Sequence, residues 1–211
     1  MTFRLEAINM EWDFFNSMAI IAFAFSGAIV ALQEKYDIFG VYVLGLAASF
    51  GGGYIRCVLM GLPVKPIWEQ GSLLYIALAA ITIIYMLPKN WLHSWNRWND
   101  FFDAVGLSAF AIQGAIFALS FHLPLGAVIL SSIVTGIGGG MLRDVLARRK
   151  PMILQQEIYA VWAILVGVVI GMGWVDTHNV VELYSLFIAV TILRMLSIVY
   201  KWHLRLRELP N

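Results

Sequence analysis

The chain has 211 residues, of which 61% are hydrophobic and 13% charged, and its formal net charge at pH 7 is +1. A soluble domain is typically about half apolar and about a quarter charged, so this composition indicates a protein that is solvated by lipid. The small net charge predicts no binding of nucleic acid. Cys57 is the only cysteine, which excludes an internal disulfide, and the four histidines are too dispersed for a metal site. We therefore expect no cofactor.

Seven apolar segments follow one another along the chain, each near the length of about 20 residues that a helix needs to cross a bilayer. The first is preceded by acidic residues and lacks the basic region of a signal peptide, so we expect it to remain as a transmembrane helix. The sequence predicts an all-α integral membrane protein with a single membrane domain over residues 1–211. The predicted spans are 14–33, 39–60, 70–88, 102–121, 125–147, 157–174 and 180–200.

Lysine and arginine are concentrated in the loops on one side of these spans, whereas the other side offers only Arg4 and Lys65. Short loops rich in basic residues stay in the cytoplasm. We therefore expect a multi-pass protein of the cell membrane with its N-terminus outside and its C-terminus in the cytoplasm. The basic residues on the predicted cytoplasmic side are Lys35, Lys89, Arg97, Arg148, Arg149, Lys150, Lys201, Arg205 and Arg207.

The first three spans are repeated at an offset of 87 residues. This offset places the glycine triplet that begins at Gly51 on the one that begins at Gly138, and Arg56 on Arg143. The first repeat covers about 14–88 and the second about 102–174, and a seventh helix follows at about 180–200. Because each repeat has three spans, the second copy is inverted in the bilayer, an architecture that is common among membrane transport proteins.

Each glycine triplet lies inside the second helix of its repeat. Glycine costs about 1 kcal/mol relative to alanine in a helix, so three in succession predict an interrupted or kinked helix whose freed carbonyls line a path for cations. The alternative is that the glycines only allow close helix packing. The predicted kinks are Gly51, Gly52, Gly53, Gly138, Gly139 and Gly140, and small or polar neighbours that extend the lining are Ser49, Ser131, Ser132, Thr135 and Gln113.

An arginine follows each triplet, Arg56 in the first repeat and Arg143 in the second. Ionisable residues inside a membrane indicate function by default, and we interpret these as charges that gate the pore. The alternative is that both side chains extend to the lipid headgroups, as we also expect of Arg194. Asp144 is an acidic partner, but adjacent residues do not face each other on a helix, so we expect it to pair with another helix. Asp103 is explained by its place at a helix start.

The basic run Arg148, Arg149 and Lys150 is explained by membrane topology, and the sharper interpretation is a site for anionic membrane lipid.

The motifs FAFSGA at 23–28, GGGYIR at 51–56 and GGGMLRD at 138–144 resemble the TRIC (trimeric intracellular cation) channel family, most closely its bacterial and archaeal branch. The resemblance implies a homotrimer in which each protomer has a pore lined by its second and fifth helices. It implies that this pore passes monovalent cations, K⁺ or Na⁺ and chiefly K⁺. It also implies that Arg56 and Arg143 are the charges at the pore and that Asp144 is their acidic partner. This chain departs from the fuller pattern at Cys57, where an aspartate often follows the arginine.

The alternative function is a transporter for a small solute such as glycine, in which helix N-termini and an arginine would hold a carboxylate. A third class is a membrane enzyme or lipid-binding scaffold. The spans contain no evident Ser–His or paired-aspartate arrangement, and GIGGGM lacks the Lys-Ser/Thr of a phosphate loop. We therefore expect that the protein is not an enzyme.

Overall fold

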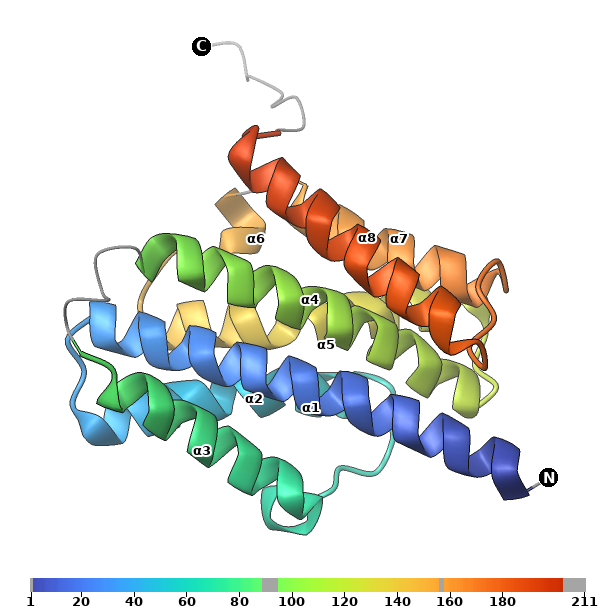
Figure 1. Ribbon diagram of the computed structural model, residues 1–211, viewed down its shortest axis with the longest axis horizontal. Coiled ribbons are helices and arrows are strands. Elements are labelled where there is room, and N and C mark those ends of the chain that lie inside the picture. The colour runs from blue at the N-terminus through green and yellow to red at the C-terminus, as the bar shows by residue number, and fades with distance from the viewer. Residues whose placement is uncertain (1, 89–94, 156–157, 203–211) are drawn as a thin grey trace.

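The computed structural model describes residues 2–88, 95–155 and 158–202, and the described chain is helical throughout, as predicted (Figure 1). Helix α1 begins at Thr2, well before the predicted start at residue 14. The elements are α1 (Thr2–Gln33), α2 (Ile38–Leu59), the 3₁₀ helix η1 (Ile67–Gln70), α3 (Ser72–Met86), α4 (Trp95–Ser120), α5 (Leu125–Leu146), α6 (Met152–Gln155), α7 (Tyr159–Gly171) and α8 (Val180–Val199).

Five of these helices are long and apolar enough to cross a membrane: α1 from Asp13, α2, α4 from Arg97, α5 and α8. The predicted spans 70–88 and 157–174 correspond to the shorter apolar helices α3, of 15 residues, and α7, of 13 residues. In each repeat a short helical piece, η1 or α6, precedes the third helix. Apart from Gln70 of η1, these short pieces lie before the predicted third spans, and they were not predicted from the sequence.

The helices of the two repeats are arranged in the same way but run in opposite directions. Figure 1 shows α1 and α4 side by side and antiparallel. The helix α3 packs on α1 and α2, and α7 packs on α4 and α5, while α8 covers α4 and α7. Where α1 meets α4, the rings of Phe23 and Phe110 stack with centroids 5.5 Å apart. These two residues lie 87 positions apart, so the repeats meet at equivalent side chains.

The first two helices of each repeat approach closely at a glycine. A Cβ atom built on Gly27 would lie 2.7 Å from the Cα of Gly45, and one on Gly114 would lie 2.6 Å from the carbonyl oxygen of Ser131. Neither contact leaves room for a side chain. Because lipid offers no hydrophobic drive between helices, such contacts between small residues hold membrane helices together. Gly27 and Gly114 are equivalent in the repeat, so both halves use the same contact.

The helices α1 and α5 end, and α4 begins, at the same end of the bundle (Figure 1). Basic residues are concentrated in the segments that follow α1 and α5. The Nε of Arg149 lies 2.5 Å from the Oε1 of Glu34, which ties the end of α5 to the end of α1. We call this the basic end. It includes Lys35, Arg148, Arg149 and Lys150.

Candidate functional site

The two glycine triplets lie where α2 and α5 cross. A Cβ atom on Gly139 would overlap the carbonyl oxygen of Ala48, and one on Gly52 would overlap the carbonyl oxygen of Thr135. A Cβ on Gly138 would lie 3.0 Å from the Cα of Gly52. The offset of 87 residues relates Ala48 to Thr135 and Gly52 to Gly139, so the first two contacts are equivalent. The backbones of α2 and α5 therefore touch at two places related by the repeat.

Both helices continue through their triplets, α2 from Ile38 to Leu59 and α5 from Leu125 to Leu146. The prediction that these helices are interrupted is therefore wrong, while a kink at the triplets stays a prediction. The alternative of close packing accounts for most of the glycines. A helix that is hydrogen-bonded throughout satisfies its own backbone groups, which lipid does not do. A Cβ on Gly51 would lie 2.7 Å from the Cδ2 of Leu142. The assignment of the glycine triplets to a pore stays a prediction.

Gly53 and Gly140 differ from the other members of the triplets. No described atom lies within 4 Å of a Cβ built on Gly53, so packing does not require a glycine there. A Cβ on Gly140 would lie 3.1 Å from the hydroxyl oxygen of Tyr159 and 3.2 Å from the Oδ1 of Asp103. Gly140 therefore makes room for polar side chains of α7 and α4, not for a second backbone.

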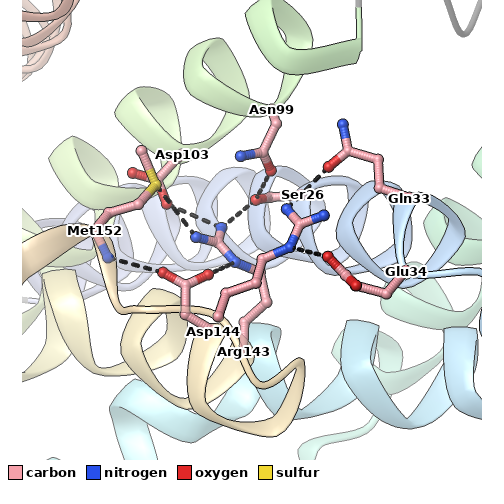
Figure 2. A network of polar contacts seen from close by, with 9 residues as sticks. Ser26, Gln33, Glu34, Asn99, Asp103, Arg143, Asp144 and Met152 are labelled. Carbon is pink, nitrogen blue, oxygen red and sulfur yellow. Dashed lines mark hydrogen bonds and ion pairs between the residues drawn. The ribbon is translucent and has the colours of Figure 1, made fainter. Parts of the chain in front are cut away.

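The side chain of Arg143 is fully buried at the centre of a polar network (Figure 2). Its Nη1 donates to Asp103 Oδ1 at 3.0 Å and also to the hydroxyl of Ser26, and its Nε donates to Asp144 Oδ1 at 2.8 Å. The hydroxyl of Ser26 in turn donates to Asn99 Oδ1 at 2.7 Å. The network thus joins α1, α4 and α5 through one guanidinium.

Two expectations about the acidic residues are wrong. Asp144 pairs with its neighbour Arg143, because the long arginine side chain carries its Nε back to the adjacent carboxylate. The second oxygen of Asp144 accepts a hydrogen bond from the backbone N–H of Met152 at 3.0 Å. Asp103 is not at a helix start, because α4 begins at Trp95, and its side chain is fully buried against Arg143. One guanidinium is therefore shared by two buried carboxylates.

Arg56 is also buried, but its surroundings are less polar. Its Nη1 donates to Gln113 Oε1 at 2.8 Å, and its guanidinium carbon lies 3.7 Å from the centre of the Phe117 ring, a cation–π contact. The Nε of Arg56 has no hydrogen-bond partner among the described residues. Only 6% of Arg56 and none of Arg143 is exposed, so the alternative that these side chains extend to the headgroups is wrong.

Arg194 likewise does not extend to the headgroups. It is 1% exposed, and its guanidinium carbon lies 4.5 Å from the centre of the Tyr159 ring. This contact attaches α8 to α7 beside the Arg143 network.

Arg56 and Arg143 are equivalent in the repeat, and the residues that they contact are equivalent as well. Arg143 contacts Ser26, and Arg56 contacts Gln113, which is the residue 87 positions after Ser26. Each arginine therefore reaches the first helix of the other repeat. The equivalence ends at the carboxylates, because the positions that match Asp103 and Asp144 hold Asn16 and Cys57.

The hydroxyls proposed to line a pore all bond to backbone carbonyls. Ser131 donates to Gly114 at 2.5 Å and Ser132 donates to Ala163 at 2.8 Å, each on another helix, whereas Thr135 donates to Ser131 of its own helix at 2.6 Å. Ser49 donates to Ile20 and to Gly45. These bonds stabilise helix contacts, and a role in a pore stays a prediction.

A pocket of about 800 Å³ opens at the basic end beside the Arg143 network. Its wall includes Gln33 from α1, Asn99 and Asp100 from α4, and Asp144 from α5. Arg149, Lys150 and Met152, from the segment after α5, complete it. Arg149 is bonded to Glu34 and to Gln33, so the basic run lies at the rim of a polar cavity. Its predicted binding of anionic lipid stays a prediction.

Solved structures share this arrangement of helices. A prokaryotic TRIC channel is 34% identical to this chain and superposes with a TM-score of 0.80, covering 93% of this chain and 100% of that one. A TRIC orthologue from Rhodobacter sphaeroides is 27% identical with a TM-score of 0.74, covering 90% and 98%. The fold is therefore that of a multi-pass membrane protein of the TRIC type.

The chain belongs to the glycine transporter family, whose model matches residues 13–89 and 100–174. The UPF0126 membrane protein YvgT of Bacillus subtilis is 51% identical to it over 202 residues, which are 96% of each chain. The UPF0126 inner membrane protein YadS of Escherichia coli is 37% identical over 190 residues, or 87% of this chain and 89% of that one.

Proposed function

We propose that the protein is a channel for monovalent cations, K⁺ in particular, with one path in each protomer along α2 and α5. The observation that carries this proposal is the pair of buried arginines, Arg56 and Arg143, which lie beyond the α2–α5 contact on opposite sides of it. The support from relatives is the likeness to solved TRIC cation channels at 34% and 32% identity. A buried guanidinium lies at each end of the contact, and that of Arg56, which has no carboxylate partner among the described residues, repels cations. The described conformation is therefore closed, and conduction requires both side chains to move.

The proposed assembly follows a relative, and the proposed orientation follows the basic residues. We propose a homotrimer, because the orthologue from Rhodobacter sphaeroides is described as a trimeric channel. We propose that the basic end faces the cytoplasm of the cell, because basic loops remain on that side of a membrane.

The test is electrical recording from purified protein in planar bilayers under a K⁺ gradient, with uptake of labelled glycine into liposomes measured in parallel. We expect unitary K⁺ currents that do not saturate at millimolar concentrations, and no glycine uptake above empty liposomes. Saturable glycine uptake without unitary currents would contradict a channel.

One observation favours the second candidate, a transporter for a small amino acid. Arg56 has no carboxylate partner among the described residues, and its Nε is unpaired. A substrate carboxylate would complete that site with a charge-assisted hydrogen bond. The glycine measurement separates this function from the channel.

Replacing Arg56 with alanine is expected to raise the unitary K⁺ conductance severalfold, because it removes a fixed positive charge from the path. The matched control is Arg148→Ala, which removes the same charge from an exposed residue at the end of α5. An unchanged conductance in Arg56→Ala, together with lower thermal stability, would assign Arg56 to packing alone.

A further inference from the structure

The pocket at the basic end lies directly beside the Arg143 guanidinium. Asp144 and Met152 line the pocket, and both contact Arg143. The Nε of Arg143 lies 2.8 Å from Asp144 Oδ1, and its Nη2 lies 3.5 Å from the sulfur of Met152. Figure 2 shows both side chains pointing toward this guanidinium, with Asn99 from α4 nearby. An ion that enters the protein from the basic end through this pocket therefore meets its wall before it meets Arg143.

Two of the charged side chains in the wall of the pocket form ion pairs with described residues. Asp144 is paired with Arg143, and Arg149 is paired with Glu34. Lys150 is exposed and lies at the rim of the pocket. Asp100 is different, because it is half-buried in the wall and makes no hydrogen bond or ion pair with another described residue. The Asp100 carboxylate therefore has no direct partner among the described residues.

We propose that this pocket is a vestibule that binds hydrated monovalent cations, and that the Asp100 carboxylate concentrates them there. The inference rests on the proposed channel function and adds its ion-attracting residue. The volume of about 800 Å³ accommodates a cation with its water shell. A carboxylate in a concave site with low-dielectric walls raises the local concentration of counter-ions, and acidic side chains at a mouth are a general device of cation channels. The amide of Asn99 beside it adds a polar surface for the water shell.

The test compares unitary K⁺ currents of the wild type and Asp100→Asn at two salt concentrations. We expect the variant to lose about half or more of its conductance for ions that enter from the basic end at about 0.05 M salt, and to match the wild type near 1 M, where the screening length falls to about 3 Å. Asp13→Asn is the matched control. It is the equivalent position of the first repeat, exposed and near the start of the transmembrane part of α1, and we expect it to leave these currents unchanged.

A second measurement separates charge from packing. In a Cys57→Ser background, which serves as the baseline, Asp100→Cys is treated with methanethiosulfonate reagents of opposite charge. We expect the anionic reagent to restore the low-salt conductance and the cationic reagent to lower it further. Equal effects of the two reagents would overturn the proposal, as would a loss in Asp100→Asn that persists at 1 M salt.

The outcomes for the vestibule and for the channel are distinct. A wild type without K⁺ currents contradicts the channel itself. A conducting wild type whose low-salt currents are the same in Asp100→Asn contradicts only the vestibule. Currents in either protein that depend on anionic lipid through Arg149 and Lys150, with no effect of Asp100, would assign the pocket to a lipid headgroup instead and overturn the cation site.

Discussion

Replacing Gly139 with alanine is expected to destabilise the folded protein by about 1–3 kcal/mol or more and to abolish K⁺ flux. The added methyl group would overlap the carbonyl oxygen of Ala48, which belongs to a helix backbone and has no rotamer to change. The helices α2 and α5 would have to separate along their contact. The measurement is thermal unfolding in detergent followed by tryptophan fluorescence, together with flux from liposomes.

The matched control for this variant is Gly53→Ala, because a Cβ atom at Gly53 meets no described atom within 4 Å. Alanine favours a helix by about 1 kcal/mol over glycine, so we expect this protein to be as stable as the wild type or slightly more so. A Gly139→Ala protein with the same unfolding temperature as Gly53→Ala would show that α2 and α5 are not in backbone contact.

Replacing Arg143 with glutamine is expected to cost about 3–5 kcal/mol, the range for breaking one side of a buried ion pair. The change leaves the carboxylates of Asp103 and Asp144 buried without their shared cation. The equivalent change, Arg56→Gln, leaves behind only the amide of Gln113, and we expect it to cost about 1–3 kcal/mol. Both costs can be measured as shifts in thermal unfolding of the purified variants.

A combined variant checks the electrostatic origin of this difference. Arg143→Met with Asp103→Asn and Asp144→Asn removes all three charges together, and buried ion pairs replaced by neutral groups often leave stability little changed. We expect it to recover most of the stability lost in Arg143→Gln. Equal losses of stability in Arg143→Gln and Arg56→Gln would mean that the two carboxylates are not the cause of a difference in stability between the two arginine sites.

The helices were predictable because lipid imposes their length and polarity. Apolar runs bounded by basic or turn residues placed α1, α2, α4, α5 and α8 within a few residues, apart from the earlier starts of α1 and α4. The third helices α3 and α7 were also placed within a few residues, but the short helix that precedes each of them was not predicted. Gly71 has a φ of 56°, in the left-handed region, and it separates η1 from α3. Hydropathy identifies long apolar runs, so it does not show a helix as short as η1.

The candidate site was predictable in its residues but not in its contacts. Arg56, Arg143 and Asp144 stand out as charges in apolar segments, whereas Ser26, Asn99 and Asp103 do not, because a sequence does not show which neighbour a helix face meets. One signal was present. Ser26 and Gln113 are equivalent in the repeat, so an interaction found for one arginine predicts the matching interaction for the other.

The glycine triplets show why helix propensity was a poor guide here. Propensity scales are measured in water, where a frayed backbone can bond to solvent. In lipid a broken helix leaves its N–H and C=O groups unpaired, so the helical hydrogen bonds persist through Gly51–Gly53 and Gly138–Gly140. What glycine contributes instead is the absence of a side chain.

The contact of α2 with α5 also restricts how the protein can move. The helices touch near the middle of each, at Ala48 against Gly139 and at Gly52 against Thr135. Two rods that turn about a contact near their midpoints separate at both ends in the same step. Such a turn would loosen the Arg56 side and the Arg143 side together, as a continuous water-filled path requires. Alternating access needs one end to close while the other opens. For that, the carbonyl oxygens of Ala48 and Thr135 must move away from Gly139 and Gly52, which they contact in the described conformation.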